Sequence, residues 1–240
     1  MKVIRFGVEG VLNSFRVPFF RTYHKSFLAP PKTTIIGMLC NISLKSQKEF
    51  FEILENNFIE VSVVIEDIKG KSKDLWSYKT LDKKNRGKSI IRRDKLFKAK
   101  YTIYLKIDNK ELFDEIIDAL ENPKNVPSLG LDDEIVAIFF DSKNDVIDLK
   151  GNESNIIDSI FLDKGIDYKV IIKDITKMVE LPLSNVTATK FKAFDKKGNL
   201  IPREVKEEFR QVEFINCQIE FKENIKSYID EQLNNKLIFY

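Results

Sequence analysis

Alternating hydrophobic and polar residues predict three strands in the first half of the chain. The pattern runs through residues 2–9 and returns at residues 58–68 and 101–107. A period of two places the apolar side chains on one face, as in a half-buried strand. Residues 134–140 are nearly all apolar, which is typical of a strand at the centre of a sheet. The first half of the chain therefore offers four strands for one sheet.

Apolar residues spaced three or four apart predict three helices between these strands. The first helix follows the double proline at positions 30 and 31, which forces an extended approach because a residue before proline avoids the helical region. Residues 46–57 predict the second helix, and Ser46 and Glu49 have the spacing of a capping box. The third helix is expected over residues 110–121, an amphipathic run that ends before a proline.

The order of these elements, β-α-β-β-α-β, predicts an α+β fold. We interpret it as the ferredoxin-like plan shared by RNA-recognition domains, spanning residues 1–140. Residues 141–240 differ: residues 141–163 are polar and acidic and predict a linker, while residues 225–233 predict a short closing helix or an exposed tail. Short strands are expected over residues 168–173, 178–183, 186–194 and 209–221. The second half therefore predicts a small β-rich C-terminal domain.

Charge is strongly segregated along the chain, although the net charge is only +3. Residues 1–32 hold six Lys or Arg against one acid, and residues 69–106 hold fourteen against three. These segments carry +5 and +11, which leaves −13 for the rest of the chain. Solubility requires only net charge, so this segregation favours a basic face for a polyanion.

The second basic segment predicts a protruding arm. Over residues 69–95 the apolar alternation fades, and the stretch is too long for a tight hairpin. We interpret it as a basic two-stranded β-hairpin with its tip near residues 82–87; a disordered loop is the alternative. Trp76 lies in this arm, where it could stack on nucleic-acid bases or pack at the root of the arm.

The first basic segment combines cations with aromatic rings ahead of a helix start. Residues 15–27 interleave Arg16, Arg21 and Lys25 with five rings. A threonine of the pair Thr33-Thr34 could cap the following helix, whose first amides are donors suited to an anion. These features suit a nucleic-acid backbone, and an ordinary basic surface loop before a capped helix is the alternative.

Enzymatic and metal chemistry have little support in the sequence. His24 is the only histidine, and no Cys/His cluster or glycine-rich G-x-G loop occurs. Asp132-Asp133-Glu134 is expected to be a solvated loop end. Cys40 and Cys217 are expected to be buried free thiols in a reducing compartment. No signal peptide or membrane span is evident, so we expect a cytoplasmic protein without cofactor, metal, membrane or small-molecule substrate.

A block of residues near the N-terminus carries a resemblance to a known family. It consists of a glycine, an FR-x-P element, a tyrosine and a PP-x-TT-I-x-G-x-L helix start. The matching residues are Gly10, Phe15, Arg16, Pro18, Tyr23, Pro30, Pro31, Thr33, Thr34, Ile36, Gly37 and Leu39. In these residues and in the order of its first elements, the chain resembles the Cas-five family, the RAMP-type subunit of type I CRISPR surveillance complexes (Cascade), with a type I-B-like character.

The resemblance implies a non-catalytic RNA-binding subunit. Such a subunit grips the 5′ handle of the CRISPR RNA (crRNA), caps one end of the filament of backbone subunits and contacts the large subunit. The basic arm takes the place of the family's thumb hairpin. The residues expected to contact RNA are Arg5, Arg16, Arg21, Tyr23, Lys25, Lys32, Thr33, Thr34, Trp76, Arg86, Arg92 and Arg93.

Two rival functions stay open from the sequence. One is a metal-independent endoribonuclease that processes CRISPR precursor RNA with Tyr23, His24 and Lys25, as some relatives do. These three residues are consecutive, and neighbours in an extended segment point to opposite faces. We therefore expect His24 to face away from Tyr23 and Lys25, and we expect no catalysis. The other rival is a nonspecific single-strand binder outside CRISPR.

Overall fold

The computed structural model describes most of the 240 residues. The described residues are 1–17, 20, 23–79, 87–158, 161–163, 167–172, 183–192, 194–195, 197–199, 206–214 and 218–240. The chain is a mixed α/β structure that consists mostly of strands. No helix within this described part is long and apolar enough to cross a membrane.

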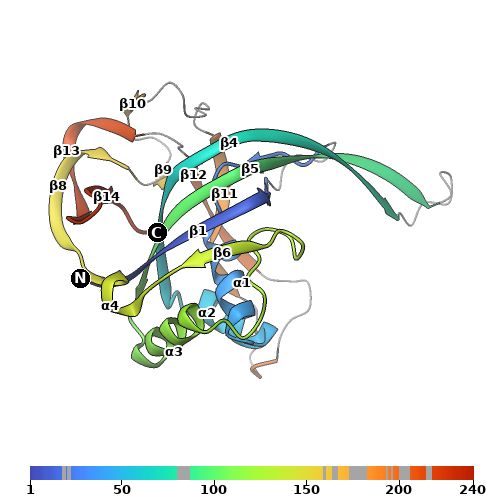
Figure 1. Ribbon diagram of the computed structural model, residues 1–240, viewed down its shortest axis with the longest axis horizontal. Helices are drawn as coiled ribbons and strands as arrows, with labels where there is room; N and C mark the ends of the chain where they lie inside the picture. The colour runs from blue at the N-terminus through green and yellow to red at the C-terminus, as the bar shows by residue number, and fades with distance from the viewer. Residues whose placement is uncertain are drawn as a thin grey trace.

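A sheet built on β1 (Lys2–Asn13) organises the first half of the chain (Figure 1). Its strand order is β4-β5-β1-β6, with β4 (Ile59–Lys79), β5 (Lys88–Ile107) and β6 (Val136–Phe139), and all pairs are antiparallel. The predicted order of strands and helices through residue 140 is confirmed. The central place expected for residues 134–140 is wrong, because β6 lies beside β1 only and Phe139 is 57% exposed.

Three helices cover one face of this sheet (Figure 1). They are α1 (Lys32–Ile42), α2 (Gln47–Glu55) and α3 (Lys110–Glu121), so the bounds predicted for α3 are confirmed. The capping box at α2 is also confirmed: Ser46 accepts from the Glu49 amide while the Glu49 side chain accepts from the Ser46 amide. The threonine cap predicted for α1 is wrong, because Pro31 is the N-cap and no side chain caps the helix.

The core between helices and sheet holds the apolar residues that the alternation predicted. Phe6, Ile36 and Ile103 are at most 1% exposed and belong to one cluster with residues of α2 and α3. Cys40 is buried in the same cluster and is a free cysteine, so the expected buried free thiol is confirmed there, and burial raises the pKa of this thiol to about 12. Cys217 lies outside the described residues.

The predicted arm is an unbroken extension of the central hairpin. β4 and β5 pair from Ile59 with Ile107 out to Lys79 with Lys88, with a register shift between Ile65 and Asp67. The two strands extend far beyond the body of the molecule as a curved ribbon (Figure 1). Two-stranded pairing is therefore confirmed up to residues 79 and 88, while most of the predicted tip lies outside the described residues.

Residues 141–240 contain more regular structure than the sequence predicts. The elements are α4 (Ser142–Asp145), β7 (Val146–Asp148), β8 (Lys150–Ile157), β9 (Phe161–Asp163), β10 (Tyr168–Ile171), β11 (Leu183–Lys192), β12 (Lys206–Phe214), β13 (Gln218–Asp230) and β14 (Asn235–Leu237). The linker over residues 141–163 is wrong, because α4, β7, β8 and β9 occupy it. The closing helix over residues 225–233 is also wrong, because β13 runs through Asp230 and pairs with β8 and β14. The strand predicted over residues 178–183 lies outside the described residues except Leu183.

The end of the chain packs against the first sheet, and Ile157, Ile219 and Phe221 also form a small buried cluster of their own. β7 pairs with β1, and Tyr240 exchanges backbone hydrogen bonds with Val61 at 3.0 and 3.1 Å. Leu149 and Leu237 form a buried cluster with Val3, Val64 and Tyr104. Packing therefore crosses the domain boundary predicted at residue 140. This occurs because β4 and β5 alternate apolar side chains on both faces, and the second face needs a cover.

Candidate nucleic-acid interface

The loop that follows β1 is anchored to the core through a small hairpin. β2 (Phe15–Arg16) pairs with β3 (Ser26–Phe27), and the Val17 amide donates to the Lys25 carbonyl at 2.8 Å. Phe15 is 2% exposed and packs edge-on against Tyr101, with ring centroids 6.0 Å apart. The exposed Arg16 thus projects from a rigid base.

The two basic segments meet where this loop joins the arm. The His24 amide donates to the Arg92 carbonyl at 2.8 Å, and the Asp94 amide donates to the His24 carbonyl at 2.9 Å. His24 therefore extends the sheet alongside β5 for one residue. These backbone hydrogen bonds join the loop before β3 to β5, two segments about 70 residues apart in sequence, and make one continuous surface of them.

A cleft of about 400 Å³ lies at this junction. It is lined by the β2–β3 hairpin with the residues just before β3, by the start of α1, by both strands of the arm, and by the loop before β6. The lining residues with functional side chains are Arg16, His24, Lys25, Thr34, Trp76, Arg93 and Asp94. The structure thus brings together residues that the sequence assigned separately to the loop, the helix start and the arm.

The cations around the cleft differ in how they are engaged. No carboxylate in the described part of the chain pairs with Arg16 or Lys25, and the Lys25 ammonium lies 5.7 Å from the Phe20 ring. Arg93 pairs with Asp74 and stacks on Trp76, 4.7 Å from the ring centroid. Arg16 and Lys25 therefore keep their charge available for an anion.

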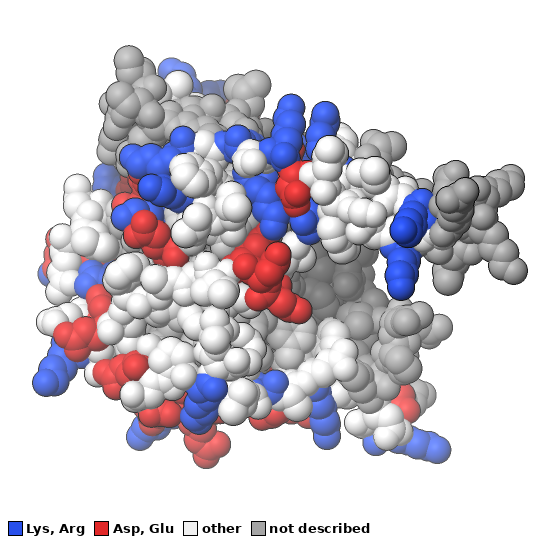
Figure 2. Space-filling view, turned by 45° about the vertical axis from the view of Figure 1, so that its right-hand side comes forward, with Lys and Arg blue, Asp and Glu red and all other residues white. Residues whose placement is uncertain are grey.

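Other cations continue this surface along the arm. Arg92 is exposed and lies 5.5 Å from the Tyr23 ring, which also contacts Phe20. Figure 2 shows Lys and Arg side chains following the hairpin towards its distal end. Arg21 and Arg86, which the sequence also assigned to RNA contact, lie outside the described residues.

His24 is surrounded by positive charge. Burial lowers its pKa, and the nearby guanidinium groups of Arg16 and Arg93 lower it further. The imidazole is therefore neutral at pH 7. His24 and Lys25 both line the cleft, whereas Tyr23 contacts Arg92. The prediction that neighbouring side chains point to opposite faces thus holds for His24 and Tyr23, but His24 and Lys25 share the cleft.

The part of the cleft lined by Ser14, Gly130 and Leu131 is held by a buried ion pair that the sequence did not reveal. Lys95 Nζ lies 2.5 Å from Glu134 Oε1, and both side chains are at most 8% exposed. Glu134 Oε2 also accepts from the amides of Ser14 and Leu131 at 2.6 and 3.0 Å. The solvated loop end predicted at residues 132–134 is therefore wrong for Glu134. A β carbon on Gly130 (φ +119°) would lie 2.0 Å from the same carboxylate, so only glycine fits.

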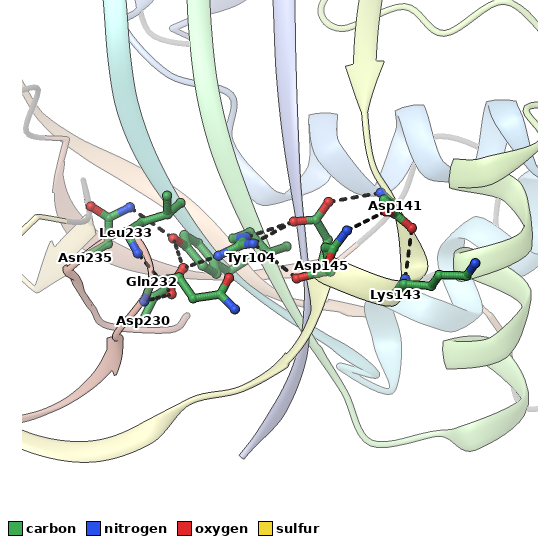
Figure 3. A network of polar contacts seen from close by, with 10 residues as sticks. Tyr104, Asp141, Lys143, Asp145, Asp230, Gln232, Leu233 and Asn235 are labelled. Carbon is green, nitrogen blue, oxygen red and sulfur yellow. Dashed lines mark hydrogen bonds and ion pairs between the residues drawn. The ribbon is translucent and has the colours of Figure 1, made fainter.

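Arg5 lies apart from this cleft, where its charge is paired with two carboxylates, and its phosphate contact stays a prediction. Its Nη1 lies 2.9 Å from Asp230 Oδ2, and its Nη2 lies 2.7 Å from Asp145 Oδ1. The Tyr104 hydroxyl donates to the same Asp230 oxygen at 2.9 Å, within the network drawn in Figure 3. The Arg5 side chain is only 10% exposed, and its charge is used to hold residues from β1, α4 and β13 together.

Lys32 also points away from the cleft. Its ammonium donates to Asn57 Oδ1 at 2.6 Å and to the Tyr240 carbonyl at 3.5 Å, and burial lowers its pKa to about 8. Lys32 is not among the residues that line the cleft, and its phosphate contact stays a prediction. Thr33 lines a neighbouring depression, and Thr34 lines both that depression and the cleft. Within the described residues, no group of three or more His, Cys, Asp or Glu is placed to hold a metal ion.

Comparisons with known proteins point to one group. Residues 3–176 match the model of a family described as CRISPR-associated protein (Cas_Cas5). A chain of a "CRISPR RNA-guided surveillance complex" has a TM-score of 0.52 at 12% identity, with 96% of this chain and 92% of that chain covered. A "CRISPR protein from Archaeoglobus fulgidus" has a TM-score of 0.51 at 13% identity, with 99% and 98% covered. Because the identities are this low, the comparison shows only that this chain is similar in fold to these two structures. A search of curated proteins finds no match.

Proposed function

Because the chain belongs to the CRISPR-associated protein family (Cas_Cas5), we propose that it is a crRNA-binding subunit of a type I Cascade surveillance complex. In this role it grips the 5′ handle of the crRNA, caps one end of the backbone filament and contacts the large subunit, in the cytoplasm. Similarity in fold to a chain of a CRISPR RNA-guided surveillance complex supports membership of an assembly of this kind.

The strand order supports a ferredoxin-like plan for the RNA-binding half. In that plan the first strand lies between the third and fourth, and the second lies outside the third. Counting β1, β4, β5 and β6 as the four strands, the observed order β4-β5-β1-β6 agrees with it. The helices cover one face. Leu149 and Leu237, from the second half of the chain, pack on the other face against Val64 and Tyr104, so we place the RNA at the edge where loop and arm meet.

The cleft at that edge is the observation that carries the proposal. Single-stranded RNA is bound by positively charged grooves that follow the backbone, together with rings on which bases stack. Arg16 and Lys25 supply charge without a carboxylate partner among the described residues, and Trp76 supplies a ring that is 45% exposed. The extended arm offers further cations, including Arg92, to RNA that leaves the cleft.

The test is the salt dependence of RNA binding. Full-length protein is titrated with a single-stranded RNA that carries the 5′ handle, over a series of salt concentrations. Each contacted phosphate contributes a slope of about −0.7 in log K against log salt concentration for single strands. A steep slope is expected for the wild type. A slope near zero, or equal affinity for the RNA and for an uncharged analogue of its backbone, would contradict the proposal.

We also propose that the protein does not cut RNA. Cleavage through a ribose 2′-hydroxyl needs a base and a donor for the leaving oxygen. A neutral His24 would suit the base and Lys25 lines the same cleft, but the chain has no second histidine to complete an acid–base pair. Incubation with precursor repeat RNA in EDTA is expected to give no product. A product with a 2′,3′-cyclic phosphate that His24→Ala abolishes would establish the endoribonuclease rival instead.

A further inference from the structure

An aromatic ring, that of Trp76, lines the cleft together with the cations, and a site for phosphate alone would not need it. Trp76 lies at the cleft with 45% of its surface exposed. Tryptophan is enriched at binding surfaces, where its large ring supplies contact area for a partner. The arm could bind a polyanion through its cations alone, and the ring therefore needs a separate explanation.

The position of the ring is set by its neighbours on the arm. The Arg93 guanidinium stacks 4.7 Å from the Trp76 centroid, and the Tyr78 ring lies 5.9 Å away at an angle of 31°. Arg93 is in turn held by Asp74, the residue directly opposite it across the hairpin. Arg93 is thus a positioning residue, supporting the ring rather than binding phosphate. A ring supported in this way loses little conformational freedom when a ligand stacks on it.

The polar groups around the ring favour a base over a phosphate inside the cleft. Asp94 lines the cleft beside Trp76 and Arg93, and its carboxylate repels phosphate but accepts from the N–H groups that every nucleobase presents. Arg16 and Lys25, which have no described carboxylate partner, are available for the phosphates on either side of that base. The volume of about 400 Å³ lies at the lower end of the range for small-molecule pockets, which suits one nucleotide rather than a stacked run.

We propose that this cleft is a pocket for a single unstacked nucleobase of a bound single-stranded RNA, with the base stacked on Trp76 and its flanking phosphates on Arg16 and Lys25. The inference rests on the proposed RNA-binding function and adds to it a defined one-base site. It makes one nucleotide of the RNA different from the others, because the remaining nucleotides contact the protein through their backbone.

Trp76 is the only tryptophan of the chain, so its fluorescence reports on this pocket directly. The probe is a set of single-stranded RNAs of about eight nucleotides, within the usual site sizes for such proteins, each with one base removed at a different position. Binding of the intact RNA to full-length protein is expected to quench the fluorescence. The RNA that lacks the base for the pocket is expected to bind without quenching and with a roughly 5- to 150-fold loss of affinity.

The matched variants are Trp76→Ala and Leu75→Ala. Leu75 is the adjacent residue on β4, 72% exposed and not among the residues that line the cleft. Trp76→Ala is expected to lower affinity as much as removal of the critical base does, and combining the two changes should cause no further loss. Leu75→Ala should leave affinity unchanged. The salt slope should stay the same in all of these, because stacking displaces no counterions.

The possible outcomes separate this inference from the proposed function. Binding with a steep salt slope, but with fluorescence unchanged and every base removal equivalent, would overturn the one-base pocket and leave the RNA-binding function standing. Absence of RNA binding at any salt concentration would overturn both. The pocket would be established if quenching is lost on removal of one particular base and if Trp76→Ala causes no further loss of affinity for that RNA.

Discussion

Two arginines on successive strands of the chain, β1 and β2, do opposite things in this protein. Arg5, on β1, is buried and gives its charge to Asp145 and Asp230, which joins α4 and β13 to the first sheet. Arg16, just beyond the same strand, is exposed beside the cleft and has no described carboxylate partner. The difference teaches that a basic residue near a nucleic-acid surface contributes to binding only if the fold leaves its charge unpaired.

The largest effect expected from this comparison is on stability, through Arg5. Arg5→Ala would leave the buried carboxylate of Asp230 and the partly buried carboxylate of Asp145 without their cation. Removing one partner of a buried ion pair typically costs about 3–5 kcal/mol in the free energy of unfolding. Urea unfolding followed by circular dichroism measures this loss. RNA affinity of the folded protein should be unchanged, and a variant that lost RNA affinity at full stability would return Arg5 to the interface.

A second buried pair, Lys95 with Glu134, is expected to respond more weakly to loss of its cation, because Lys95 neutralises one carboxylate whereas Arg5 neutralises two. In Lys95→Met the Glu134 carboxylate keeps its hydrogen bonds from the Ser14 and Leu131 amides. The loss is therefore that of a charged hydrogen bond, about 1.5–3 kcal/mol. The control is Lys100→Met, which breaks the exposed pair with Glu9 and should change the free energy of unfolding by about 0.5 kcal/mol or less. Equal losses in the two variants would mean that burial of Lys95 does not matter.

Loss of the cations beside the cleft is expected to change RNA binding without changing the free energy of unfolding. Arg16→Ala combined with Lys25→Ala should reduce the salt slope for RNA binding by about 1.4, or 0.7 per lost phosphate contact. Lys32→Ala is the matched control, since Lys32 donates to Asn57 and Tyr240 outside the cleft. The slope should be unaltered in this control. A reduced slope in Lys32→Ala with an unaltered one in the double variant would reverse our assignment of the interface.

Local signals explain which parts of the fold could be predicted. The bounds of α3 and the capping box at Ser46 depend on residues within one or two turns, and the sequence shows them directly. The arm followed from the charge and length of its segment. The strand β13 was predicted in part as a helix, because apolar residues at positions 225, 228 and 229 have a helical spacing. Pairing with β8 and β14 overrides that local preference, and no local pattern reports such pairing.

Two residues expected at the interface lie apart from the cleft because of contacts that no local pattern shows. Arg5 pairs with Asp230, which is 225 residues away. Lys32 donates to Asn57, 25 residues away, and to the Tyr240 carbonyl, 208 residues away. No period or motif connects positions so far apart. One partner was within reach: Asp74 and Arg93 face each other in a hairpin whose register can be counted outward from its tip. That count would have separated the supporting Arg93 from the available Arg16.

The smallest expected effect concerns pH and sharpens the role of His24. In the free protein, burial and the charges of Arg16 and Arg93 lower its pKa below its ordinary value of about 6.5. A phosphate bound beside these groups would favour the charged imidazole and raise that pKa, so binding takes up a proton. RNA affinity should therefore increase as pH falls from 7 to 5, by up to roughly tenfold for each unit of pKa difference between free and bound protein.

The stability of the free protein should change with pH in the opposite direction, which makes the test specific. The folded state keeps His24 neutral while the unfolded state takes up a proton, so the contribution of His24 to stability is present above pH 6.5 and is lost as pH falls below it. Affinity is measured by fluorescence anisotropy of labelled RNA across this range for the wild type and His24→Asn. The variant should have a flat profile. A wild-type affinity that falls on acidification would place the phosphate elsewhere and leave His24 as part of the cleft wall only.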